Sequence, residues 1–132
     1  MSWWDVVYER IAIGDEFLTP GYGIDGGNKR KPFKVIGKFQ DKIKIRSGDY
    51  PIPLDKECFE IIESAFRNNP TLWLRVAAIK ECDALPGSAD ELIKKGTGSN
   101  LARANYICSI LESYGLVRYR MEGKRKGIVL IG

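Results

Sequence analysis

Polar side chains gather in one stretch of the chain, where the sequence predicts a helix that begins at Ser99 or Asn100. Apolar residues between Ala104 and Leu111 recur at helical spacing and predict a buried face. The opposite face could hydrogen-bond to base edges, because Asn suits adenine and Arg suits guanine or phosphate. A solvated helix face of no function would carry the same residue types. The candidate contacts on this helix are Ser99, Asn100, Arg103, Asn105, Tyr106 and Ser109.

A basic hairpin is predicted directly after this helix. Residues 117–121 alternate along a strand, so Val117, Tyr119 and Met121 face one side and both arginines face the other. The turn at residues 122–124 leads into a second strand that begins with further cations. A hairpin tip of this kind can lie along phosphates or in a minor groove. The candidate contacts on the hairpin are Arg118, Arg120, Lys124, Arg125 and Lys126.

The elements that position these residues form a known order. The predicted order is a short helix over Ala89–Lys95, a glycine turn at residues 96–98, a helix that ends at Tyr114, and the hairpin. This segment resembles the winged helix-turn-helix DNA-binding superfamily, over about half of the chain and without pointing to a single family within it. The resemblance implies a recognition helix and a wing that bind double-stranded DNA. A helix over Leu72–Leu85, capped by Thr71, would be the first helix of that unit.

Charge is concentrated in the same segment. From Lys94 to Gly132 there are eight basic and two acidic residues, a net of +6, whereas the whole chain is +4. Such a local excess is typical of a surface that binds nucleic acid.

The N-terminal half has a different pattern, with short strands separated by tight turns. Strands are expected over residues 13–19, 33–39, 43–46 and 50–54, after a helix over residues 3–10 and before a helix over residues 56–66 capped by Asp55. The expected fold class is therefore α+β, with a small bent β-sheet or SH3-like barrel followed by a winged helix-turn-helix. The expected domains are residues 1–67, a β-rich module with flanking helices, and residues 68–132, the winged helix-turn-helix.

Basic residues also dominate residues 29–46, which carry eight cations and one acid. Four of these cations occupy polar positions of the strand alternation and predict one basic sheet face. Such a face could bind nucleic acid, or its lysines could protect a sheet edge from aggregation. The residues of this possible second nucleic-acid surface are Lys34, Lys42, Lys44 and Arg46.

Several kinds of chemistry lack their usual residues. The chain has no histidine, three cysteines and no CxxC motif, so we expect no catalytic residues, no metal and no cofactor. Residues 21–26 match GxGxxG but lack the strand before and helix after that a dinucleotide site needs. Glu122 and Lys124 resemble half of a nuclease metal site, which a wing turn explains better. Unpaired cysteines and the lack of a signal peptide or apolar span favour a cytoplasmic protein.

These patterns predict a non-catalytic protein that binds double-stranded DNA, as a transcription regulator or an accessory DNA-recognition module. A protein-protein docking module built on a winged helix is the first alternative, and RNA binding through the lysine-rich sheet is the second. The sequence leaves the target site, the oligomeric state, an effector and the pathway undefined.

Overall fold

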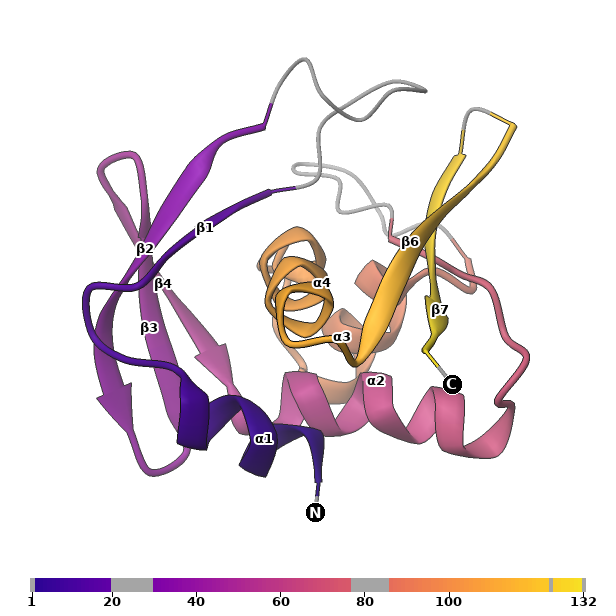
Figure 1. The fold of residues 1–132 in the computed structure, drawn as a ribbon, viewed down its shortest axis with the longest axis horizontal. Helices are drawn as coiled ribbons and strands as arrows, with labels where there is room; N and C mark the ends of the chain where they lie inside the picture. Colours follow the sequence, from indigo (N-terminus) through magenta and orange to yellow (C-terminus); the bar gives the residue numbers. More distant parts are fainter. Residues whose placement is uncertain (1, 20–29, 77–85, 124, 132) are drawn as a thin grey trace.

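A computed structural model of the chain describes residues 2–19, 30–76, 86–123 and 125–131. Two antiparallel sheets stand at opposite ends of the molecule's longest axis, and helices fill the space between them (Figure 1). The expected α+β class is confirmed at this level.

The first sheet is an antiparallel meander in which each strand pairs with the next. Its inner face buries alternate residues, among them Phe33, Val35 and Ile43, and a bulge lies between Val35 and Gly37. In the described residues no pairing joins its two outer strands, so the sheet is open rather than a closed barrel. The elements of this half are α1 (Trp3–Arg10), β1 (Glu16–Leu18), β2 (Pro32–Phe39), β3 (Lys42–Ser47) and β4 (Tyr50–Asp55).

The second sheet has the order β5-β7-β6, so its first strand pairs with its last. Two helices precede the β6–β7 hairpin, and α4 lies in the middle of the molecule between the two sheets (Figure 1). The elements of this half are α2 (Lys56–Asn68), β5 (Leu74–Arg75), α3 (Ala89–Thr97), α4 (Ala104–Ser113), β6 (Val117–Glu122) and β7 (Arg125–Leu130).

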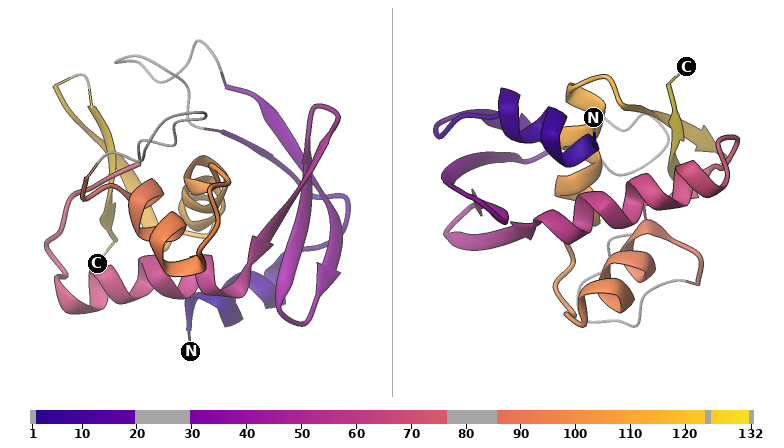
Figure 2. Two further views of the ribbon diagram at one scale, coloured as in Figure 1. Left: turned by 180° about the vertical axis from the view of Figure 1, so that it is seen from behind. Right: turned by 90° about the horizontal axis from the view of Figure 1, so that it is seen from below.

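Helix α2 runs along the long axis from the end of β4 toward the second sheet (Figure 2). It packs chiefly on α3 and also on α1 and β4. The buried apolar side chains of both halves form one continuous cluster, which includes Phe59 and Ile62 of α2 together with residues of both sheets. Residue 67, the expected domain boundary, therefore falls near the end of a helix that contacts both halves.

Two predicted helix limits are wrong. Residues 72–76 do not begin a helix, because Leu74–Arg75 pairs with β7 as a strand, and the rest of the expected helix, 77–85, lies outside the described residues. Helix α4 begins at Ala104, not at Ser99 or Asn100. Gly98 ends α3 with a positive φ of 69°, and the hydroxyl of Ser99 accepts a bond from the Leu101 amide in the connection.

Candidate nucleic-acid interface

Arg103 is the residue whose position differs most from the predicted helix face. Its side chain is 1% exposed, and its guanidinium donates to Asp55 at 2.6 Å, to the Pro53 carbonyl at 3.2 Å and to the Thr97 hydroxyl at 3.0 Å. The side chain is buried among these partners, so its guanidinium does not reach the solvent. The prediction that Arg103 lies on an exposed DNA-reading face is therefore wrong.

Tyr106 and Ser109 are also buried, against the same prediction. Tyr106 packs edge to face on Phe33, with ring centroids 5.1 Å apart, because the first sheet lies against this side of α4. Ser109 shares a 3.0 Å hydrogen bond with the Tyr119 hydroxyl. Both polar groups on α4 thus serve packing between elements instead of facing solvent.

The three remaining candidates near α4 are not joined into one surface. Ser99 and Asn100 lie in the connection before the helix, where Asn100 is exposed and Ser99 is half-buried. Asn105 lies on α4 and is half-buried. Helix α4 therefore offers little to a DNA groove from the residues predicted to read bases.

The outer face of the second sheet carries the exposed cations. Arg118 and Arg120 alternate with Tyr119 on β6, as the sequence predicted, and both are exposed. Directly paired residues of neighbouring strands lie on the same face of a sheet. Glu122 pairs with Arg125 of β7, which places Arg125 on the face of Arg118 and Arg120. Gly127 pairs with Arg120 on one side and with Arg75 of β5 on the other, which places Arg75 on this face too. This surface, called the arginine face below, comprises Arg75, Arg118, Arg120 and Arg125, with Glu122 as the acid among them.

Sequence reasoning missed Arg75 because residues 72–76 fit helical as well as strand spacing. The one signal for a strand is the alternation of apolar Leu74, basic Arg75 and apolar Val76. That pattern is too short to identify from sequence, and only the pairing of Arg75 with Gly127 gives the residue its place.

A tryptophan braces the arginine face at its centre. The indole nitrogen of Trp73 donates to the Arg120 carbonyl at 2.9 Å. The ring lies against Gly127, where an added Cβ would be 2.3 Å from the ring carbon Cε2. Because Arg120 and Arg75 flank Gly127 in the sheet, the indole occupies the space between two arginine positions.

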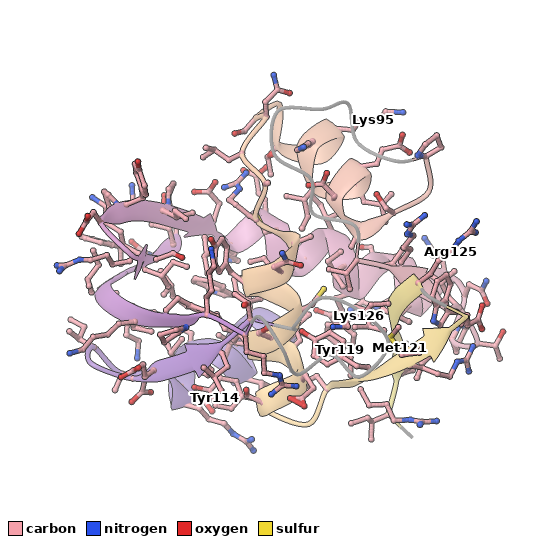
Figure 3. The ribbon with its side chains drawn as sticks, turned by 90° about the horizontal axis from the view of Figure 1, so that it is seen from above. Lys95, Tyr114, Tyr119, Met121, Arg125 and Lys126 are labelled. Atoms are coloured by element: carbon pink, nitrogen blue, oxygen red, sulfur yellow. The ribbon has the colours of Figure 1, made fainter. Side chains whose placement is uncertain are left out.

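The inner face of the hairpin is of a different kind. Tyr119, Met121 and Lys126 lie on the side opposite Arg118 and Arg120. Figure 3 shows these three side chains near one another on the hairpin, seen from above. Burial raises the pKa of Tyr119 above its usual range, so its hydroxyl stays protonated and bonded to Ser109. Lys126 is half-buried on this face, and Lys124 lies outside the described residues.

A cavity of about 440 Å³ lies between β1, α4 and β6. Glu16 and Glu112 line it together with Arg30, Ser109, Ser113 and Tyr119. Two carboxylates in one cavity disfavour a phosphate ligand by like-charge repulsion. The cavity therefore does not extend the cationic surface.

The predicted second surface on the first sheet is exposed in large part. Lys34, Lys44 and Arg46 are exposed, and Lys42 is half-buried, while Ile43 and Ile45 between them are fully buried. The alternation thus places four cations on the outer face, as predicted. This face and the arginine face lie at opposite ends of the molecule (Figure 1).

Carboxylate and thiol side chains are the remaining candidates for metal binding or reactive chemistry in the described residues. No cluster of three or more His, Cys, Asp or Glu side chains that could hold a metal occurs within residues 2–19, 30–76, 86–123 and 125–131. Burial raises the thiol pKa to about 11 for Cys58 and to about 12 for Cys108. The GxGxxG stretch and Cys82 lie outside the described residues. In the same ranges, no helix is long and apolar enough to cross a bilayer.

Comparisons of the chain with protein-family models, with curated proteins and with solved structures found no match.

Proposed function

We propose that this chain binds double-stranded DNA without catalysing a reaction, and that the arginine face contacts the DNA. The observation that carries the proposal is the placement of four arginines from three strands on one sheet face, with one glutamate among them. Guanidinium groups bind phosphate oxygens through two parallel hydrogen bonds, and they also suit the acceptor edge of guanine.

The shape of the hairpin fits a duplex groove. A two-stranded ribbon is narrow enough to enter the major groove, and β6 and β7 form such a ribbon with Arg118, Arg120 and Arg125 on one side. Trp73 fixes the ribbon to the body of the protein through Gly127 and the Arg120 carbonyl. A hairpin with a fixed backbone loses less conformational entropy on binding than a free hairpin does.

The distribution of acids supports the same orientation. The exposed face of α2 carries Glu57 and Glu60, which would repel phosphates. Two arginines are paired with a neighbouring acid, Arg67 of α2 with Glu63 and Arg120 of the arginine face with Glu122 at 2.8 Å, and each pair offsets part of the charge there. A duplex is therefore expected to approach the second sheet and to avoid α2.

The order α3, α4, β6 and β7 is the helix, turn, helix and hairpin order that the resemblance to winged helices implies. We place the start of that unit at α2, since α2 packs mainly on α3. The burial of α4 moves the proposed DNA contact from the second helix to the hairpin. An accessory DNA-recognition module fits this arrangement better than a sequence-reading transcription regulator, because α4 exposes few base-reading side chains.

Fluorescence anisotropy with a short mixed-sequence duplex tests the proposal. The variant R118Q/R120Q/R125Q should lose about tenfold or more in affinity at low salt. The matched control is R10Q/K56Q/R67Q, which removes three exposed cations from α1 and α2 and should bind as the parent chain does. Equal losses in both triple variants, or no duplex binding by the parent chain, would overturn the proposal and favour a protein-docking module.

A further inference from the structure

The outer face of the first sheet exposes an aromatic ring in an unusual setting. Phe39, at the end of β2, is 46% exposed although it is a large apolar residue. Its ring lies against Gly37, where an added Cβ would be 2.8 Å from the ring carbon Cε2. Glycine at position 37 therefore lets the ring lie close to the sheet surface.

Cations on β3 surround this ring. Lys42 pairs directly with Phe39, and Lys44 pairs directly with Gly37. The Lys42 ammonium lies 5.6 Å from the centre of the Phe39 ring. Further along the same face, Lys34 pairs directly with Arg46, so two like charges stand opposite each other.

This arrangement is not optimal for the free protein. Like charges in a directly opposed pair destabilise a sheet, and a ring that is 46% exposed leaves almost half of its surface in water. The acids in register are Glu16, opposite Lys34, and Asp55, opposite Lys42. Asp55 is held by Arg103, so it does little to neutralise this face.

We infer that this face binds single-stranded nucleic acid, with a base stacked on Phe39 and phosphates bound by Lys44 and Arg46. An aromatic ring on a sheet surface can stack on any unpaired base, and basic residues beside it follow the backbone. A duplex hides its base faces within the helical stack, so an exposed ring offers it no such contact. The single strand and the duplex of the proposed function would occupy opposite ends of the molecule (Figure 1).

The two ends are far enough apart to act independently. A domain of this length has a radius of gyration of about 14 Å, so its two ends lie roughly 30 Å apart. The Debye length at physiological salt is about 8 Å, and two bound polyanions would therefore repel each other weakly.

The test uses the full chain with labelled oligothymidine and oligouridine of about twelve nucleotides, a length that one small module can cover. Phe39→Leu removes the aromatic face but keeps a large apolar side chain, and should weaken binding roughly 5- to 100-fold. Phe39→Trp keeps the stacking surface and should bind at least as tightly as the parent chain. The variant K44Q/R46Q should bind weakly and with a smaller dependence on salt.

Gly37→Ala gives an independent readout, because its Cβ displaces the Phe39 ring and leaves every charge in place. It should resemble Phe39→Leu in binding, and the thermal midpoints of all variants identify any that unfold. Equal affinity of the parent chain, Phe39→Leu and Phe39→Trp for both oligonucleotides would overturn the inference, as would absence of single-strand binding by the parent chain. Tighter binding of either oligonucleotide by the parent chain than by Phe39→Leu would sustain the inference.

A competition experiment separates this inference from the proposed function, with which it shares no residues. With excess unlabelled duplex, the labelled single strand should remain bound, and R118Q/R120Q/R125Q should bind it as the parent chain does. Displacement by duplex together with loss in that variant would overturn the inference, because both ligands would then use the arginine face. Single-strand binding without duplex binding would sustain the inference and reject the proposed function.

Discussion

The Nη1 atom of Arg103 lies 2.6 Å from the Oδ2 atom of Asp55, so a buried cation joins the start of α4 to the start of α2. Asp55 occupies the N-cap position of α2 but makes no side-chain cap bond there. Its carboxylate, which is 40% exposed, is bonded to Arg103 instead. Both residues thus have structural roles that differ from those expected of a DNA contact and a helix cap.

Breaking this pair should cost stability. We expect Arg103→Met to destabilise the chain by about 2–4 kcal/mol, less than a fully buried pair would lose, because the half-exposed Asp55 can regain water. Asp55→Asn should cost at least as much, since it leaves a buried cation without its counter-charge. Urea unfolding measures both, and duplex affinity of the folded variants should be unchanged. Unchanged stability with a large loss of duplex affinity would restore Arg103 as a DNA-reading residue.

The strands of the first sheet could be predicted because their signals are local. Turns such as Ser47-Gly48-Asp49 separate alternating segments, and the structure places β2, β3 and β4 within about two residues of the expected limits. Strand β4 also lies at the sheet edge, as its two prolines indicated. The β6–β7 hairpin was predictable for the same reason.

Tertiary contacts determine the start of α4 and the burial of its polar residues, which the sequence did not predict. Ser99 or Asn100 could cap a helix, but Arg103 is held by three groups from two other elements, β4 and α3, and α4 begins only after it. Tyr106 is covered by Phe33 of the first sheet, which lies far away in the sequence, and Ser109 is bonded to Tyr119 of β6. The spacing of residues along a helix does not show whether a distant part of the chain covers its polar face.

Gly127→Ala should disturb the arginine face without changing its charge. The new Cβ would meet the Trp73 ring at 2.3 Å, so the indole must move and lose its bond to the Arg120 carbonyl. We expect a loss of about 1–3 kcal/mol, as is usual for overpacking. A red shift of tryptophan fluorescence and weaker duplex binding should accompany it. Trp73→Phe is the control, because it removes the hydrogen bond and should reduce stability by only about 1 kcal/mol. Equal losses of stability in Gly127→Ala and Trp73→Phe would argue against overpacking at Gly127.

The salt dependence of duplex binding should reflect the arginine face. If its four arginines each neutralise one phosphate, log K should fall against log salt with a slope of roughly −3.6. Each single change, Arg118→Gln or Arg125→Gln, should reduce the slope by about 0.9. Titrations at several salt concentrations measure it. A slope that stays constant in both variants would show that these arginines do not contact phosphate.

The buried thiols should be protected in the folded chain and should make its stability depend on alkaline pH. The folded pKa values of about 11 for Cys58 and about 12 for Cys108 lie above the ordinary value of 9.0. This contribution to stability is complete below about pH 9, falls as the pH rises from there, and is lost as the pH passes the folded values. Iodoacetamide at pH 8 should modify Cys58 and Cys108 only in urea, as peptide mass mapping would show. Rapid modification of either residue without urea would contradict its burial.

Asn105 allows a direct comparison between α4 and the hairpin as the DNA-contacting element. A base-reading asparagine would lose about 1–3 kcal/mol of discrimination when changed to alanine. We expect Asn105→Ala to leave both affinity and sequence preference unchanged, because its neighbours Arg103 and Tyr106 are buried and the helix cannot enter a groove at this point. Arg118→Gln should weaken binding to every duplex by a similar factor. Selection from random duplexes with each variant measures the preference; a preference that relaxes in Asn105→Ala and persists in Arg118→Gln would assign DNA reading to α4.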